Sequence, residues 1–84
     1  MTYRVEIARP AQKIVAAMDG SVRPRVIAAI RALANDPRPP GSLKMTNRTT
    51  WRIRVGAFRV VYEINAGALL VLVVEAGHRG EIYR

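Results

Sequence analysis

The sequence predicts an α+β fold in which two helices pack on one face of a small antiparallel sheet. Three observations support this fold. Apolar residues recur at helical spacing in the first half of the chain. Alternating and continuous apolar runs, which are typical of strands, fill the second half, and a proline-rich segment separates the two halves. We therefore expect the order β-α-α-β-β-β in a single domain over residues 1–84.

The first expected elements are a short strand and a helix. Residues 2–7 alternate between polar and apolar, so that one side of the strand is apolar. The members of that side are Tyr3, Val5 and Ile7. The helix over residues 9–20 is predicted to hold Pro10 in its first turn and to have Gly20 as its C-cap. Its apolar positions are Ala11, Ile14, Val15 and Met18.

A second helix is predicted over residues 21–36, joined to the first by the tight link Asp19-Gly20. Ser21 is the expected N-cap, and Pro24 is compatible with a helix because it falls in the first turn. The apolar stripe of this helix consists of Val22, Val26, Ile30 and Leu33. The two helices should form an antiparallel hairpin whose apolar stripes cover the sheet.

The proline-rich sequence DPRPPG at residues 36–41 is a stiff break that ends the helical half. Residues 42–45 are expected to extend into a short strand, and residues 46–50 to form a loop or an irregular entry into the next strand. Further along, residues 65–67 should turn the chain into a strand over residues 68–77, which is apolar at nearly every position. Such a run is typical of the central strand of a sheet.

Residues 51–64, WRIRVGAFRVVYEI, predict a hairpin around the two-residue turn Gly56-Ala57. Alternation gives the first arm one apolar face and one face that carries arginine. The expected cross-strand pairs are Val55 with Phe58, Arg54 with Arg59, Ile53 with Val60 and Trp51 with Tyr62. The apolar partners match well, whereas the two arginines face each other.

This hairpin gathers Arg52, Arg54 and Arg59 on one face, where opposed like charges destabilise a sheet. An anion between them would relieve the repulsion, and guanidinium groups bind phosphate oxygens in bidentate fashion. The alternative is that these side chains are solvated and cover apolar neighbours with their stems. Because the helices are expected on the opposite face, the arginine face should be open, with an apolar wall beside it. The members of that wall would be Leu70, Leu72 and Val74.

The sequence GHRGEIYR at residues 77–84 follows the central strand and adds polar side chains. Arg79 offers a fourth guanidinium. Tyr83 offers a phenol, and cations close to a phenol lower its pKa, which makes it a candidate proton acceptor near neutral pH. The structural alternatives are an aromatic ring packed on the sheet edge for Tyr83 and a structural or stacking role for His78.

The chain carries 14 basic and 6 acidic residues, a net charge of +8, and twelve of the basic residues are arginine. Such a charge favours polyanionic partners, and the planar fork of arginine suits phosphate. One histidine, no cysteine and scattered acids offer no recognisable metal site, so we expect neither a metal nor another cofactor. Metal-free phosphodiester cleavage is most accessible for RNA, because its 2′-hydroxyl can act as the nucleophile.

No stretch approaches the roughly 20 uninterrupted apolar residues of a membrane span. The N-terminal sequence MTYRVEIARP also lacks the apolar region of a signal peptide. We therefore expect a soluble cytoplasmic protein without a membrane partner.

Four segments together resemble the RelE branch of the RelE/ParE toxin superfamily: DPRPPG, the following Leu-Lys, WRIRVGAFRVVYEI and GHRGEIYR. The resemblance covers nearly the whole chain and implies a RelE-like toxin domain over residues 1–84. Members of this branch are toxins of type II toxin–antitoxin systems. They cleave messenger RNA, typically in the ribosomal A site, and a co-expressed antitoxin silences them. The resemblance therefore implies an endoribonuclease that inhibits translation.

Position by position, the family's two cationic residues on the first hairpin arm fall on Arg52 and Arg54, where well-studied members carry lysine. Its phosphate-binding arginine falls on Arg59, and the arginine and tyrosine of its C-terminal motif fall on Arg79 and Tyr83. The resemblance implies that Tyr83 is the base on the 2′-hydroxyl, while Arg59 and Arg79 stabilise the charge on the phosphate. Further candidate RNA contacts are Lys44, Arg48 and His78.

Two other functions stay open. A ParE-like toxin would inhibit DNA gyrase by protein contact without catalysis, and the joint presence of Arg59, Arg79 and Tyr83 argues against it. A non-catalytic RNA-binding module would bind RNA in a salt-sensitive way without turnover. For a toxin, the basic and partly apolar face suits an acidic amphipathic segment of a cognate antitoxin. That segment would fold as it binds and form a toxin–antitoxin hetero-oligomer.

Overall fold

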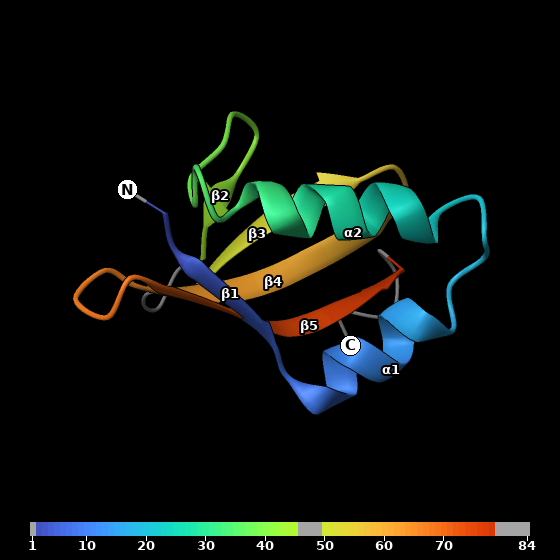
Figure 1. The fold of residues 1–84 in the computed structure, drawn as a ribbon. Helices are drawn as coiled ribbons and strands as arrows, with labels where there is room; N and C mark the ends of the chain where they lie inside the picture. Colours follow the sequence, from blue (N-terminus) through green and yellow to red (C-terminus); the bar gives the residue numbers. More distant parts are fainter. Residues whose placement is uncertain (1, 46–49, 79–84) are drawn as a thin grey trace.

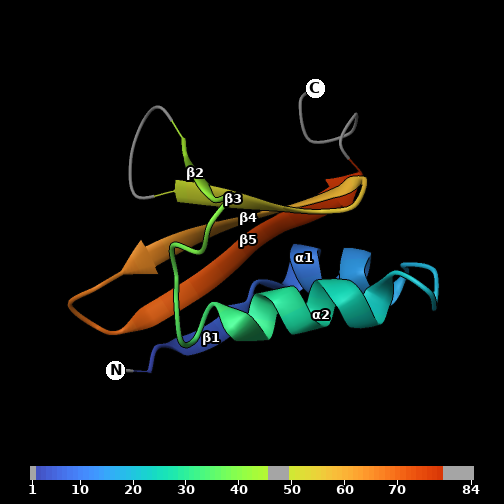
Figure 2. The ribbon, with the colours of Figure 1, turned by 90° about the horizontal axis from the view of Figure 1, so that it is seen from above.

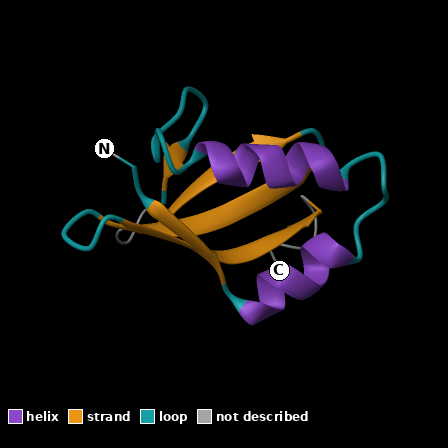
Figure 3. Ribbon diagram, viewed as in Figure 1, coloured by secondary structure: helices purple, strands orange, loops and turns teal. Residues whose placement is uncertain are grey.

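The structure, a computed structural model, describes residues 2–45 and 50–78, while residues 1, 46–49 and 79–84 lie outside the described part. The described residues form two layers, a five-stranded sheet and two helices that cover one of its faces (Figures 1 and 3). The elements are β1 (Arg4–Ile7), α1 (Arg9–Ala16), α2 (Arg23–Ala32), β2 (Leu43–Lys44), β3 (Thr50–Val55), β4 (Phe58–Asn65) and β5 (Leu70–His78). This confirms the predicted α+β class, and the order differs from the predicted β-α-α-β-β-β by one strand, because the short β2 is present in addition to the three strands that follow it.

The sheet has the strand order β1-β5-β4-β3-β2. β5 lies between β1 and β4, which confirms that the long apolar run forms a central strand. The prediction of a wholly antiparallel sheet was wrong, because β1 pairs with β5 in parallel, from Arg4 opposite Leu70 to Ile7 opposite Val73. Parallel strands need a long crossover connection, and here the chain between β1 and β5 supplies it.

β3 and β4 form the predicted hairpin in the predicted register. The pairs are Trp51 with Tyr62, Ile53 with Val60, Arg54 with Arg59 and Val55 with Phe58. Gly56 and Ala57 make the turn, and Gly56 has a φ of 61°, in the left-handed region that glycine adopts without steric strain. Local alternation and one glycine were therefore sufficient to predict both the register and the two faces of this hairpin.

Both helices are shorter than predicted. Ala17, not Gly20, is the C-cap of α1, and Val22, not Ser21, is the N-cap of α2. Each helix does carry its proline in the first turn, as expected. Because neither Ala8 nor Val22, the two N-cap residues, has a polar side chain, burial of the apolar stripes must position these helices.

The core lies between the helices and the sheet. α1 packs against β5, and α2 runs back in the opposite general direction over β3 (Figures 1 and 2). The buried cluster comprises Ala11, Val15, Met18, Val26, Ile30, Leu33, Ile53, Val60, Tyr62, Ile64, Val71, Val73 and Ala76. The predicted apolar residues of β1 pack against its edge. Neither helix of the described chain is long and apolar enough to cross a membrane.

Tyr62 ties the proline-rich segment to the sheet. Its ring is fully buried, and its hydroxyl donates a hydrogen bond of 2.7 Å to the carbonyl oxygen of Pro37. Burial raises the pKa of Tyr62 to about 12, because a phenolate would lose its hydration. The negative charge of Asp36 acts in the same direction, whereas a hydrogen bond with Ser42 and the charge of Arg38 act against it.

This raised pKa predicts a loss of stability in alkali. Tyr62 titrates near 10 in the unfolded chain and at about 12 in the fold, so its contribution is complete below pH 10 and is lost as the pH rises through 12. We expect a contribution of about 3 kcal/mol to the free energy of unfolding. Urea unfolding of the wild type and of Tyr62→Phe between pH 9 and 12 measures it. If the free energy of unfolding depends on pH in the same way in the wild type and in Tyr62→Phe, the prediction is contradicted.

Candidate nucleic-acid interface

The three hairpin arginines lie on the sheet face opposite the helices. Cross-strand partners share a face, so Arg54 and Arg59 both point away from the core. Arg52 lies two residues before Arg54 on β3 and therefore points to the same side. Their exposure differs, because Arg54 is exposed, Arg52 is half-buried and Arg59 is only 3% exposed. Alternation predicts this grouping correctly, whereas the burial of Arg59 has no signal in the sequence.

The predicted apolar wall is confirmed only in part, because Leu70 and Leu72 lie on the open face but not beside the Arg54–Arg59 pair. In the register of β4 and β5, Leu70 is opposite Asn65 and Leu72 is opposite Glu63, toward the end of β4 that is distant from the hairpin turn. Val74 falls at an irregularity of the pairing. The assumption of an unbroken alternation along β5 was wrong at Val74, whereas the register of β4 and β5 places Leu70 and Leu72 away from the arginine pair.

A β-bulge between Val61 and Tyr62 shifts the register of the two strands. As a result, Glu75 lies opposite Val61 and Gly77 lies opposite Arg59. Val61 is 4% exposed but is not part of the cluster between the layers. The open face therefore has a buried apolar residue of its own, between the arginine row of β3 and the carboxylate of β5.

A hollow of about 130 Å³, here called the arginine hollow, lies at the turn end of the hairpin. Its lining residues are Arg54, Gly56, Ala57, Phe58, Arg59 and His78. Phe58 and His78 are opposite each other, with ring centroids 5.6 Å apart in an edge-to-face arrangement at 79°. The volume corresponds to roughly four water molecules at liquid density. Two guanidinium groups at such a hollow can bind a phosphate group.

A second hollow of about 320 Å³ lies on the β2 side of Arg54. It is lined by Gly41, Leu43, Arg52, Ile53 and Arg54. Leu43 is 54% exposed and pairs with Arg52, so an apolar side chain stands beside the cations at this edge of the sheet. Because Arg54 borders both hollows, the cationic surface extends from β2 to the hairpin turn.

The remaining predicted site residues have different outcomes. His78 does border the arginine hollow. Lys44 is exposed, but its partner is Trp51, so it lies on the helix side of the sheet and not among the arginines. Arg48, Arg79 and Tyr83 lie outside the described residues, and their roles stay predictions.

The sequence pattern did not point to Arg38 as a partner of the hairpin. Its guanidinium carbon lies 5.4 Å from the ring centroid of Trp51, which is a cation–π contact. The backbone N–H of Arg38 also donates to the Asp36 side chain at 3.1 Å. The sequence signal that could have indicated this contact is the stiff segment DPRPPG, because a rigid segment after a helix can hold its side chains against the neighbouring sheet.

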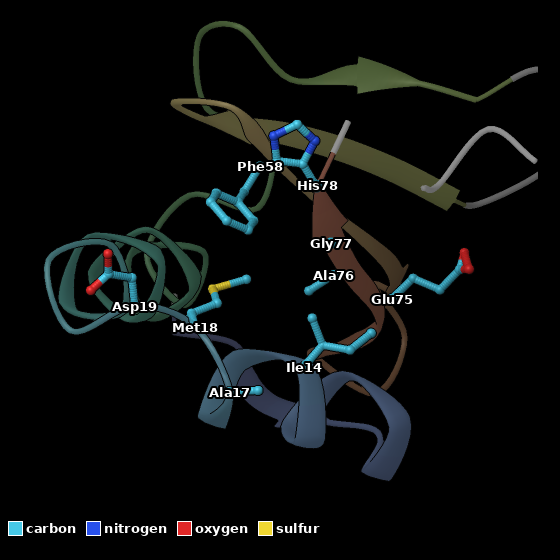
Figure 4. Close-up of a pocket in the computed structure, with 9 residues that line it drawn as sticks. All are labelled: Ile14, Ala17, Met18, Asp19, Phe58, Glu75, Ala76, Gly77 and His78. Carbon is cyan, nitrogen blue, oxygen red and sulfur yellow. The ribbon is translucent and has the colours of Figure 1, made fainter. Parts of the chain in front are cut away.

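A further hollow of about 500 Å³ lies between α1, the linker to α2 and the end of β5 (Figure 4). Its floor is apolar, and the Phe58 ring points into it between His78 and Met18, whereas Glu75 extends away from it. Phe58 and His78 border both this hollow and the arginine hollow. Ile14, which was predicted to be buried in the core, is 42% exposed because it lines this open space.

The fold and the surface show that the protein is a small two-layer α+β domain with a cationic open sheet face. Residues 5–83 match the family described as the ParE toxin of the type II toxin–antitoxin system parDE. The chain belongs to this family, and it is therefore a toxin of a type II toxin–antitoxin system in the RelE/ParE superfamily. This confirms the superfamily that the sequence motifs predicted. A comparison with curated protein sequences gives no significant match.

Solved RelE structures share the fold. The archaeal RelE–RelB complex from Pyrococcus horikoshii OT3 matches with a TM-score of 0.85 and 24% identity, over 95% of this chain and 98% of that chain. The toxin–antitoxin complex RelBE2 from Mycobacterium tuberculosis matches with a TM-score of 0.80 and 20% identity, over 94% and 100% of the chains. The isolated E. coli RelE toxin matches with a TM-score of 0.81 and 20% identity, over 96% and 90%.

Proposed function

We propose that this toxin is a metal-independent endoribonuclease that cleaves messenger RNA. The observation that carries the proposal is the cross-strand pair Arg54–Arg59 at the arginine hollow. Guanidinium groups that face each other across two strands repel, and a bound phosphate removes that repulsion. Arg59 is 3% exposed and held within the sheet, so its charge is preorganised for the negative charge that develops on a phosphate.

In the proposed reaction the substrate supplies its own nucleophile. Tyr83 acts as a phenolate, whose oxygen accepts the proton of the 2′-hydroxyl. The 2′-oxygen then bonds to phosphorus, and the bond from phosphorus to the 5′-oxygen breaks. Arg59 and Arg79 stabilise the charge on the phosphate, and Arg79 assists departure of the 5′-oxygen by donating hydrogen bonds. The 5′-oxygen takes a proton from water and ends as a hydroxyl. The second product is a 2′,3′-cyclic phosphate. Arg52 and Arg54 bind phosphate but cannot act as bases, because a guanidinium keeps its proton.

We further propose that the toxin acts on messenger RNA at the ribosome in the cytoplasm and that a cognate antitoxin silences it. Structures with this fold include RelE toxins in complex with RelB. The open face combines Arg52 and Arg54 with the exposed Leu43, which suits an acidic amphipathic segment. Such a segment would neutralise the toxin by covering the arginine cluster in a hetero-oligomer.

The family description favours a second candidate, a ParE-like toxin that inhibits DNA gyrase by protein contact. In that case the arginine face would bind the partner protein, and growth would stop without any cut in messenger RNA. The arginine pair and its hollow support the ribonuclease over this candidate, because a protein contact does not require two opposed guanidinium groups.

Induced expression of the full chain, followed by mapping of messenger RNA 5′ ends, tests the proposed function. We expect growth arrest, new 5′ ends in phase with the codons, and unchanged DNA supercoiling by gyrase. Inhibited supercoiling without new 5′ ends would replace the ribonuclease by the gyrase inhibitor. Salt-sensitive RNA binding without either effect would instead indicate a non-catalytic RNA-binding module.

A further inference from the structure

We propose that Arg25 of α2 forms a second phosphate subsite, which binds a neighbouring phosphodiester of the same RNA strand that is cut at the arginine hollow. The inference rests on the ribonuclease function proposed above. It starts from a contact between the layers, because a Cβ built on Gly56 would lie 3.8 Å from Nη2 and 3.9 Å from Nη1 of Arg25. Gly56 also lines the arginine hollow with Arg54 and Arg59.

The described residues give Arg25 no contact that would fix its position. Its side chain is exposed, and within residues 2–45 and 50–78 no hydrogen bond, ion pair or ring contact holds it. The first turn of α2 contains no acidic residue, and a cation there opposes the helix dipole. The nearby Arg23 differs, because its Nη1 donates a hydrogen bond of 3.1 Å to the carbonyl oxygen of Ala16 and so ties the two helices together.

The position of Arg25 extends the cationic surface around the tip of the hairpin. Arg54 and Arg59 belong to the open face, Arg25 belongs to the helix layer, and Gly56 lies between them at the turn. Figure 1 shows the start of α2 and the β3–β4 turn at the same end of the molecule, and Figure 2 shows that they belong to the two different layers. Because Gly56 has no side chain, an RNA strand can pass over the turn and bring its next phosphates to Arg25.

Binding of a single-stranded 2′-O-methyl RNA, which cannot be cleaved, to the full chain at several salt concentrations tests the subsite. Arg25→Ala should weaken binding about two- to fivefold. It should also reduce the slope of log K against log salt by ~0.7, the value for one phosphate contact with a single strand. Arg25→Lys should keep the wild-type slope. Arg31→Ala, with the same charge change in the last turn of the same helix, should leave affinity and slope unchanged.

Equal effects of Arg25→Ala and Arg31→Ala, or no effect of either, would overturn the subsite. A loss seen with ribosomes but not with the free strand would also overturn it, because the phosphate would then belong to ribosomal RNA. The ribonuclease proposal fails separately. Binding that depends on Arg25, without cleavage by the wild type, removes only the ribonuclease. If the wild type cleaves RNA but Arg25→Ala changes neither cleavage nor binding, only the subsite proposal is removed.

Discussion

Arg59→Met is expected to lower the rate of messenger RNA cleavage roughly 10²- to 10³-fold while the chain stays folded. Arg59 lies opposite Arg54, is 3% exposed and borders the arginine hollow, so its guanidinium cannot easily be replaced by a neighbour or by water. Methionine keeps an unbranched stem that fills the space but carries neither charge nor N–H donors. The rate at which new 5′ ends accumulate after induction measures the effect.

Arg4→Met is the matched control, because it makes the same change of charge elsewhere on the sheet. Arg4 lies on the edge strand β1, where its Nε forms an exposed ion pair of 3.0 Å with Glu6. We expect this variant to cleave as the wild type does. Thermal unfolding of both variants distinguishes loss of fold from loss of chemistry. A folded Arg59→Met protein with wild-type cleavage would exclude Arg59 from charge stabilisation.

Tyr83→Phe is expected to lower the cleavage rate about 10²- to 10⁴-fold, the range for removal of a general base. Affinity for uncleavable RNA should stay unchanged, because the phenol is proposed to move a proton and not to bind phosphate. The two assays together therefore separate chemistry from binding.

Tyr3→Phe removes a phenol hydroxyl from the edge of the core and serves as the control, with activity expected at the wild-type level. If Tyr83→Phe cleaves normally, another group must accept the proton. If it loses affinity and cleavage together, Tyr83 binds the RNA and the proposed base is wrong.

The β3–β4 hairpin was the most predictable part of the molecule, because its information is local. Alternation between Trp51 and Val55 determined the faces, and Gly56 located the turn, so the pairing of Arg54 with Arg59 followed directly. This local information was sufficient to identify the arginine cluster before any tertiary structure was known.

Other features depend on contacts that are distant in sequence. Nothing near β1 indicates that it lies beside β5 and not at another position in the sheet. The bulge at Val61 and Tyr62 interrupts an alternation along β5 that looks continuous, and it takes Val74 out of the predicted apolar wall. The approach of Arg25 to the hairpin turn likewise arises only when the layers pack, and local alternation carries no signal for the burial of Arg59.

The parallel pairing of β1 with β5 also affects when the toxin becomes native. The first partners are at positions 4 and 70, so closing this pair needs a long loop and gives the fold a high contact order. The β3–β4–β5 meander can form locally, but α1 packs on β5 and lacks its partner surface until that strand exists. The nascent chain therefore cannot complete the packing of β1 and α1 before β5 has been synthesised.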